Sequence, residues 1–461
     1  MRQITARFDV QLRRFISGTS AAAILVLGLG SGLAHAETLT EALAAAYANN
    51  PTLNAARAGT RATDEGVPAA IAGYRPTVSA GATATFQSSR TLESRIGQIA
   101  LTLTQPIFRG FRTENSVKSA EAAVKASRAA LRNTEQTVLL DAVTAYMNLV
   151  QDRAIVDLRK SNMTFLSEQV RAANDRFSVG EGTRTDVAQA KAAFASASSA
   201  LSLAEATVKA DEGTYRQVVG HDPKGLSSAR AVLQLLPKSY DSALSQARQN
   251  HPAISAAVFN SDVAALNVKI IEGELLPTVS LSTSVGRTWA SGQTSTNTGT
   301  AFSVTGDINI PLYQGGAVYA RVRQAKEQYG QAQLQVDSTR DQVQAQLIAA
   351  WGTLEAAEAQ ITAARSQVDA ARLALDGVIE EHRVGQRTTL DVLNAQTDLV
   401  DAQVSRVQAE RDAVVASYAV LSSIGKLSSE DLSLKVTSYK PEVHYTKVRD
   451  KWGGLRTPDG R

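Results

Sequence analysis

The chain contains no cysteine, and aromatic residues make up only 5% of its 461 positions. Without cysteine there is no disulfide framework, no thiolate metal site and no lipid anchor on an N-terminal cysteine. Because aromatic residues are few while Ala, Gln, Ser and Thr are abundant, the composition favours thin, closely spaced helices over a thick globular core. After residue 36 there is no apolar run of about 18 residues, so the sequence predicts no membrane-spanning helix.

Residues 1–36 are predicted to be a signal peptide. A basic head of arginines precedes a short apolar run, 21–29, and Ala34-His35-Ala36 is a cleavage site of small residues. This segment supplies most of the formal net charge of +4, so the mature chain is nearly neutral and has no basic bias toward nucleic acid. Export without a lipid anchor leaves the periplasm, the outer membrane or secretion.

A long internal repeat organises the rest of the chain. Residues 179–187 and 384–392 both begin with Val-Gly and end with Asp-Val, and Pro-Thr-Val-Ser occurs at 76–79 and 277–280. Short motifs that recur at nearly the same spacing of about 200 residues indicate a duplicated unit. The predicted segments are a signal peptide (1–36), a first repeat (37–220), a connector (221–240), a second repeat (241–425) and a terminal segment (426–461). We expect residues 442–461, which are polar and basic, to be disordered.

Each repeat contains two stretches in which apolar and small polar residues alternate: 77–88 and 96–106 in the first, 277–288 and 301–311 in the second. Such alternation predicts half-buried strands, each long enough to cross a bilayer when tilted. The face of Ser, Thr, Gly and Gln suits a water-filled lumen, and a soluble hairpin in a sandwich is the alternative. Four strands cannot close a barrel, so several chains must pool them. Eight strands from a dimer and twelve from a trimer both remain open.

After each strand pair the sequence predicts a long helical hairpin, 114–218 in the first repeat and 317–424 in the second. Between residues 343 and 378 the apolar residues follow a 4-3-4-3 spacing, which is typical of a coiled coil. In the first repeat Asp152 and Arg159 interrupt this spacing. A coiled coil without a channel would explain the helices but not the alternating strands.

Helices are also predicted to begin at Pro51 and Pro252, because proline is tolerated in the first helical turn. Thr38 and Glu41 have the spacing of a capping box for the helix before Pro51. His251, which precedes Pro252, is expected to be a surface residue and a weaker cap than asparagine. Since the returning helix of each hairpin is about half as long as the outgoing one, the proline-led helices are expected to stack above it. Each repeat would then present two full-length columns.

In its strand-exit motifs (105–110 and 310–316), its Val-Gly turns and the Thr-Asp-Val and Leu-Asp-Val that follow them, the chain resembles the TolC family of outer-membrane efflux proteins. The resemblance covers nearly all of the mature chain. It implies an α+β membrane protein: a homotrimer whose twelve-stranded β-barrel, surrounded by outer-membrane lipid, continues into a periplasmic α-helical barrel. It also implies an exit duct for tripartite efflux or type I secretion, gated at its helical tip. A periplasmic adaptor and an inner-membrane pump or ABC transporter would be the partners.

The resemblance assigns a gate latch to the two Val-Gly turns. The family's latch arginine corresponds to Arg387 and its partners to Thr185 and Asp186. The latch tyrosine corresponds to His382, which departs from the family pattern and would retune the latch. From the residues alone, a solvated surface charge is the alternative interpretation of Arg387. Asp186 is equally readable as a first-turn carboxylate that stabilises the helix dipole by ~0.3–1 kcal/mol.

The resemblance also assigns a pore constriction and docking tips. The family's inward pair of acids corresponds to Asp391 and Asn394, so one of the two charges is missing and a double acidic ring is not expected. The adaptor-facing glycines correspond to Gly180 and Gly385. From the residues alone, these glycines are predicted to be left-handed helix ends whether or not a partner binds.

Three other classes of function compete with a passive transport channel. A structural or adhesive coiled-coil protein of the cell envelope would not need the duplicated strands. A periplasmic adaptor would have one helical hairpin flanked by compact β domains. For an enzyme, no Gly-x-Ser-x-Gly, His-Glu-x-x-His or phosphate loop is present, and the five histidines are scattered. We therefore predict no catalytic residue, no cofactor and no metal site.

Overall fold

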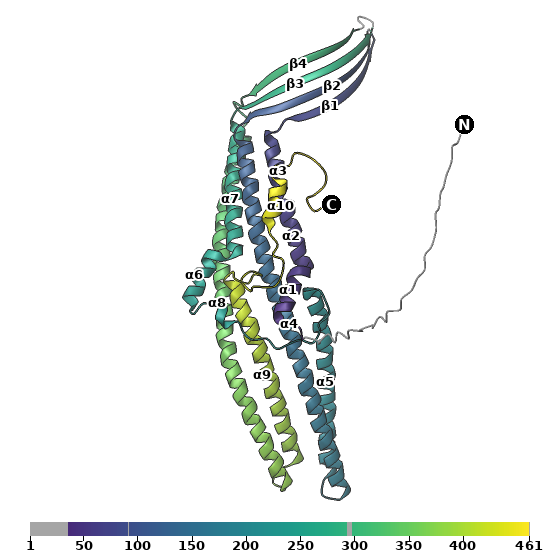
Figure 1. Cartoon of the computed structure of the whole chain (residues 1–461), viewed down its shortest axis with the longest axis vertical. Helices are drawn as coiled ribbons and strands as arrows, with labels where there is room; N and C mark the ends of the chain where they lie inside the picture. The colour runs from purple at the N-terminus through teal and green to yellow at the C-terminus, as the bar shows by residue number, and fades with distance from the viewer. Residues whose placement is uncertain (1–35, 91, 293–296, 461) are drawn as a thin grey trace, which may run out of the picture. The chain divides into compact units, whose positions relative to one another are not determined.

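The computed structural model describes residues 36–90, 92–292 and 297–460 (Figure 1). The predicted signal peptide, apart from Ala36, lies outside the described residues. The first repeat contains helices α1 (Leu39–Asn49), α2 (Pro51–Asp64) and α3 (Gly66–Ile71), the 3-10 turn η1 (Ala72–Tyr74), strands β1 (Thr77–Ser89) and β2 (Leu92–Arg109), and helices α4 (Arg112–Ser178) and α5 (Arg184–Val219).

The second repeat follows a connection that includes the 3-10 turn η2 (Leu233–Leu235). It contains helices α6 (Tyr240–Asn250) and α7 (Pro252–Glu272), the 3-10 turn η3 (Gly273–Leu275), strands β3 (Thr278–Gly292) and β4 (Asn297–Asn309), and helices α8 (Ala317–Arg383) and α9 (Thr389–Ser423). A last helix, α10 (Pro441–Val448), lies in the terminal segment. The two repeats therefore have the same order of elements, except that the single helix α7 stands where the first repeat has α2 and α3.

The four strands form one antiparallel sheet in the order β1-β2-β3-β4. β2 and β4 begin at Leu92 and Asn297, each four residues before the predicted start. They are longer because pairing continues to the last residues of the hairpins, Ser89 with Leu92 and Ala290 with Asn297. Predicted strand limits based on alternation alone miss these polar ends, where hydrogen bonding rather than hydrophobicity extends the ladder.

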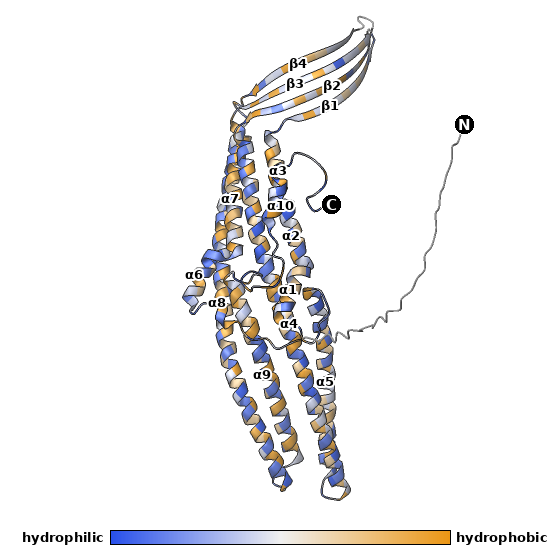
Figure 2. Ribbon diagram, in the orientation of Figure 1, coloured by the Kyte–Doolittle hydropathy of each residue, from blue (hydrophilic) through white to orange (hydrophobic). Residues whose placement is uncertain are grey.

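The register of the sheet sorts its two faces. One row of cross-strand neighbours is Val78, Leu103, Thr283 and Val304, and the next is Ala80, Leu101, Val285 and Phe302. The opposite face carries rows of small polar residues such as Ser79, Thr102, Ser284 and Ser303. Figure 2 shows the resulting mixture of apolar and polar residues along each strand. One face therefore suits hydrocarbon and the other suits water.

The helices form two columns per repeat. α4 and α8 have 67 residues each, whereas the returning α5 and α9 have 36 and 35. α5 packs against α4 and α9 against α8, while α2 and α3 pack on α4, and α7 packs on both α4 and α8 (Figure 1). The shorter helices thus cover the parts of the long helices that the returning helices leave bare, as their lengths predicted.

The largest apolar core lies where the two repeats meet midway along the helices. Its fully buried members include Tyr146 of α4, Tyr215 of α5, Leu347 of α8 and Leu421 of α9. The Tyr146 hydroxyl lies 2.8 Å from the Glu37 carbonyl oxygen, which ties the segment before α1 to this core. Outside this core the columns are thin, so most large side chains of the strands and helix tips remain exposed.

The proline-led helices are capped as their sequences predict, with one correction. Thr38 and Glu41 form the predicted capping box. Asn50 accepts hydrogen bonds from the backbone N–H groups of Thr52 and Leu53. His251, however, is not a surface residue: only 6% of it is exposed. It caps α7 because the pseudo-repeat places it where Asn50, also 6% exposed, is buried in the first repeat.

The terminal segment is ordered, contrary to the prediction for residues 442–461. α10 packs along α2, and the His444 ring, of which 8% is exposed, bonds to the fully buried carboxylate of Asp64 at 2.9 Å. Beyond it, Arg61 pairs with Asp459 at 3.3 Å. Composition alone predicted disorder because these contacts come from residues nearly 400 positions away in the sequence.

One helical stretch, Tyr240–Leu275, is long and apolar enough to cross a membrane by length and composition. It is not a continuous apolar run of the kind that the sequence prediction excludes, because Asn260, Ser261 and Asp262 interrupt it. The stretch is not one helix, since the chain breaks at His251 and Pro252 between α6 and α7. α7 packs against both α4 and α8, yet only 11% of the most apolar window of this stretch is buried.

Candidate functional site at the helical tips

The two predicted tip glycines adopt the left-handed conformation, as predicted for helix ends. Gly180, after α4, has φ +83°, and Gly385, after α8, has φ +83° as well. A Cβ added at either position would meet open space, so only the backbone conformation requires glycine there. Val179 and Val384, which precede the glycines, are each 70% exposed. The repeat therefore produces two equivalent, apolar and uncovered turns.

Both turns are followed by a capping box that was not predicted. The Asp186 carboxylate accepts hydrogen bonds from the backbone N–H and hydroxyl of Thr183, at 3.1 and 2.7 Å. Asp391 does the same with Thr388, at 2.9 and 2.8 Å. These hydrogen bonds lower the pKa of both carboxyl groups. The largest contribution comes from the Thr183 side chain for Asp186 and from the Thr388 backbone N–H for Asp391. Both carboxylates are therefore held ionised at neutral pH.

The structure joins the predicted latch arginine to a partner that the resemblance did not suggest. The Arg387 guanidinium bonds to the Glu381 carboxylate at 2.7 Å, within the α8–α9 turn. Thr185 is exposed on the first turn of α5. Asp186 caps α5, and the Thr389 side chain of α9 lies near enough to its carboxylate to help lower its pKa. Asp186, rather than Arg387, therefore lies beside the opposite hairpin.

His382 lies at the junction of the two hairpins. Its Nε2 accepts a hydrogen bond from Arg176 at the end of α4, at 2.5 Å, and its Nδ1 donates to the Arg387 carbonyl oxygen at 2.8 Å. The two contacts together require the neutral ring with its proton on Nδ1, because a guanidinium only donates. Sequence reasoning missed Arg176. A basic residue in the last turn of a helix is expected for the dipole alone.

Just behind the turns, apolar packing also links the hairpins. Leu166 of α4, Ala197 of α5 and Leu393 of α9 form a small buried cluster. Beside it the buried Gln396 amide donates to the Asn162 side-chain oxygen at 3.0 Å. Asn394, the uncharged member of the predicted constriction pair, is exposed.

The residues that interrupt the coiled-coil spacing of α4 link three helices. Asp152, of which 7% is exposed, faces Asp211 of α5 and lies near Arg411 of α9. Burial and the hydrogen bond with Asp211 raise the pKa of Asp152 to about 6. Arg159 pairs with Asp401 of α9 at 3.8 Å. These polar positions therefore join the two hairpins of one chain, where a plain coiled coil would have apolar residues.

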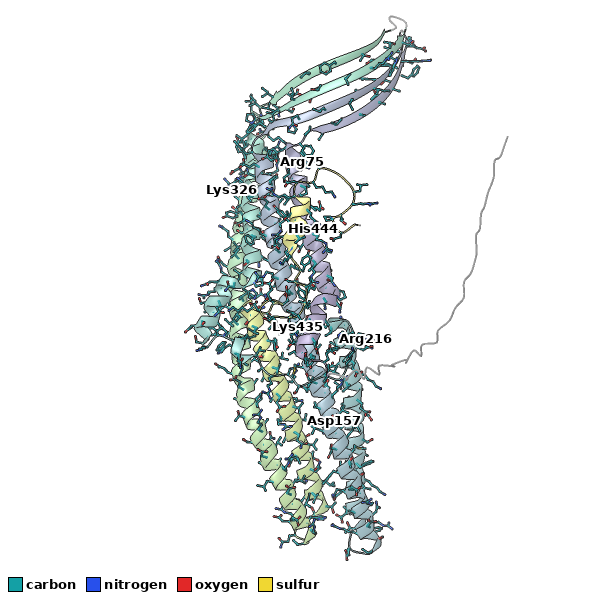
Figure 3. All side chains as sticks on the ribbon, in the orientation of Figure 1. Arg75, Asp157, Arg216, Lys326, Lys435 and His444 are labelled. Carbon is teal, nitrogen blue, oxygen red and sulfur yellow. The ribbon has the colours of Figure 1, made fainter. Side chains whose placement is uncertain are left out.

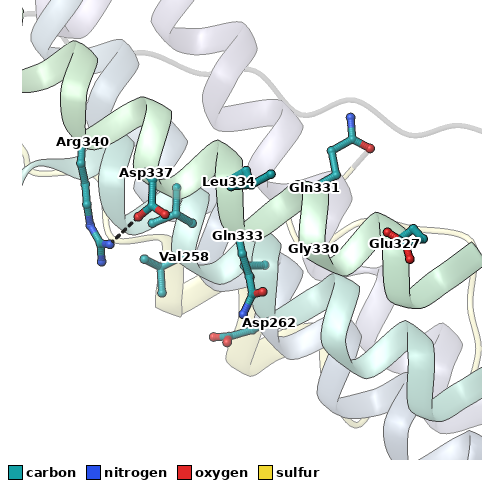
Figure 4. Close-up of a pocket in the computed structure, with 11 residues that line it drawn as sticks. Val258, Asp262, Glu327, Gly330, Gln331, Gln333, Leu334, Asp337 and Arg340 are labelled. Carbon is teal, nitrogen blue, oxygen red and sulfur yellow. Dashed lines mark hydrogen bonds and ion pairs between the residues drawn. The ribbon is translucent and has the colours of Figure 1, made fainter. Parts of the chain in front are cut away.

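A groove lies between α7 and α8 (Figure 4). Val258 and Asp262 of α7 line one side, and Leu334, Asp337 and Arg340 of α8 line the other. Asp337 and Arg340 neutralise each other at 3.0 Å. Leu334 is 71% exposed, so the groove is open and partly apolar. Across residues 36–90, 92–292 and 297–460, no group of three or more His, Asp or Glu is arranged to hold a metal ion.

A sheet with one apolar and one polar face, standing on long helices that end in paired turns, defines an outer-membrane channel with a helical extension. The profile of the outer membrane efflux protein family matches residues 42–221 and 243–426. The chain belongs to this family, which confirms the resemblance and places the protein in the outer membrane.

Individual relatives agree with this assignment. The chain is 48% identical over 365 residues to the outer membrane efflux protein BepC of Brucella suis biovar 1 (strain 1330). The aligned residues cover 79% of this chain and 80% of the relative. The chain is 25% identical over 374 residues to the outer membrane protein TolC of Escherichia coli (strain K12), 77% of this chain and 76% of that one. Its fold matches the Campylobacter jejuni CmeC outer membrane channel with a TM-score of 0.75 at 16% identity, covering 89% of each chain.

Proposed function

We propose that this outer-membrane efflux channel is the exit duct of a tripartite pump or a type I secretion system. In this proposal it works as a homotrimer, and a periplasmic adaptor and an inner-membrane pump or ABC transporter complete the path. The family membership supports the duct, and the efflux function of the relative at 48% identity favours the pump. The two unpaired edges of a four-stranded sheet support an assembly of several copies.

We further propose that the duct is gated at the helical tips by contacts between the two hairpins of each chain. The contact that carries this proposal is the hydrogen bond from Arg176 of α4 to His382 of α8. Asp186 lies beside Thr389 of α9, and the Arg387–Glu381 pair braces the α8–α9 turn that presents His382. Opening requires the hairpins to separate, so these links must break.

Single-channel conductance in a planar bilayer tests the gate. His382→Ala and Arg176→Ala each remove the link between hairpins, so both variants should conduct more than the parent protein. Arg383→Ala is the matched control, because Arg383 is a neighbouring exposed arginine that pairs with Glu380 on its own helix. If His382→Ala and Arg383→Ala leave conductance equally unchanged, the closed end is held by other contacts.

The constriction proposal rests on Asp391, which is held ionised by its cap. In a trimer three such carboxylates would surround the axis at the narrow end, while Asn394 adds no charge. A narrow mouth of one sign concentrates counter-ions, so trivalent cations should block current from the periplasmic side. Asp391→Asn keeps an oxygen acceptor for the cap and removes the charge. It should abolish most of the block in the same bilayer measurement, and block that persists would place the cation site elsewhere.

A further inference from the structure

The C-terminal tail, residues 449–460, is held beside the base of the sheet. The Arg75 guanidinium donates to the Lys451 carbonyl oxygen at 2.8 Å and lies 4.6 Å from the centre of the Trp452 ring. Arg75 stands two residues before β1 begins at Thr77, where the chain enters the barrel wall. Figure 3 labels Arg75 there and His444 on α10, from which the tail continues.

The tail is fixed at several points rather than loosely draped. α10 is anchored on α2 by the buried His444–Asp64 pair. Lys451 Nζ donates to the Arg456 carbonyl oxygen at 2.6 Å, which closes a loop, and Asp459 pairs with Arg61 of α2 at 3.3 Å. These contacts span both ends of the tail, so the conformation between them is defined.

Within this fixed loop the two largest apolar side chains are exposed, although one face of the Trp452 ring lies against Arg75. Trp452 is 74% exposed and Leu455 is fully exposed, although the loop is tethered before and after them. The basic residues Lys451 and Arg456 flank them. A tethered apolar pair with a basic rim, next to the first residues of a membrane strand, has the composition of a membrane-interface anchor. Tryptophan is enriched at bilayer interfaces, and lysine and arginine bind anionic headgroups.

We propose that the tail is a lipid-binding anchor, in which Trp452 and Leu455 enter the periplasmic leaflet of the outer membrane and Lys451 and Arg456 contact anionic headgroups. The exposed Tyr74 (53%) at the foot of β1 and Tyr313 (81%) after β4 lie at the corresponding ends of the strands and continue the same belt. This inference is independent of trimer gating. It requires only that the sheet lies in the membrane.

The absence of cysteine makes a site-specific test direct. A nitroxide on Leu455→Cys, in the full-length protein reconstituted into vesicles, reports depth by its relative accessibility to oxygen and to a polar nickel chelate. Leu203→Cys on α5 is the control, because Leu203 is 71% exposed and lies far along the periplasmic helices. The label at 455 should shift toward oxygen accessibility in vesicles of phosphatidylethanolamine with phosphatidylglycerol, while the label at 203 stays aqueous.

Two further arms separate lipid from protein as the occupant. Vesicles of phosphatidylcholine alone, or the added substitution Arg456→Gln, should reduce the shift at 455, because the anionic headgroup contact is lost. A label at 455 as aqueous as the label at 203 overturns the proposal. So does a label at 455 that is equally immobile and protected in detergent and in vesicles, since a second copy of the chain would then cover the tail.

Discussion

At the scale of single residues, the two repeats use different residues to cap the equivalent helices α2 and α7. Asn50 and His251 are equally buried, and each accepts a hydrogen bond from the helix that follows. Asparagine carries no titratable proton, whereas His251 Nδ1 must stay unprotonated to accept from the Ala253 N–H at 3.2 Å. Burial lowers the pKa of His251 to about 4. The second repeat therefore has an acid-sensitive cap that the first repeat lacks.

The sign of this effect follows from the direction of the shift. The ring is protonated in the unfolded chain below about pH 6.5 but resists protonation in the folded chain. Its stabilisation is therefore complete above about pH 6.5 and is lost as the pH falls to about 4, on the order of 3 kcal/mol per chain. His251→Asn should match the parent melting temperature at pH 7.5 and exceed it at pH 4.5. If the melting temperatures of the two proteins differ by the same amount at every pH over this range, the assignment of an acid-sensitive cap is contradicted.

The tip residues show how far single-residue prediction reaches. Left-handed Gly180 and Gly385 were predicted because a helix end needs positive φ within a few residues, which is a local property. The partner of Arg387 was not predicted, because side-chain geometry decides which of several nearby acids a surface arginine pairs with. Glu381, six positions earlier, is brought near only when the Val-Gly turn reverses the chain.

At the scale of elements, periodicity predicted the strands and hairpins well because each is a property of contiguous sequence. The register that aligns Val78, Leu103 and Val304 in one row follows from alternation once two hairpins pair. The links between the hairpins could not be predicted. Arg176 and His382 lie 206 positions apart and meet only through the packing of α4 and α9.

The two tips also carry a prediction about the adaptor. Val179 and Val384 are 70% exposed in equivalent turns, and exposed apolar residues at matched sites suit a repeated contact with a partner. Val179→Asp with Val384→Asp should reduce copurification of a periplasmic adaptor with the tagged channel. The change buries no charge in the channel itself, so its melting temperature should not move. Leu203→Asp, equally exposed but on the side of α5, is the control and should copurify the adaptor normally.

At the scale of the whole molecule, the single chain leaves two surfaces exposed that the proposed trimer would cover. β1 and β4 are the edges of a sheet in the outer membrane, and each unpaired backbone group there costs several kcal/mol in lipid. The apolar stretch Tyr240–Leu275 is only 11% buried in its most apolar window, and the open groove beside α7 exposes Leu334. A neighbouring copy would pair the strand edges and cover this flank of α7 and α8 at the same time.

Cysteine pairs across the two edges test this assembly in a chain with no native cysteine. Ser79→Cys on β1 should be combined in turn with Ser303→Cys, Thr305→Cys or Asp307→Cys on β4. Within one chain β1 and β4 are separated by two strands, about 14 Å at ~4.8 Å per strand, which is too far for a disulfide. Any bridge must therefore join two chains.

A closed trimer predicts a specific pattern on a non-reducing gel. At least one pair should give a ladder that stops at three chains, because β4 of the third copy meets β1 of the first and leaves no free edge. Ser79→Cys alone should stay monomeric, since equal edges do not face each other in a ring. A ladder that continues beyond three would mean an open or larger array. If all pairs stayed monomeric while the protein kept its strand content in vesicles, the shared barrel would be excluded. The lumen would then have to be sought within one chain, where four strands cannot enclose it.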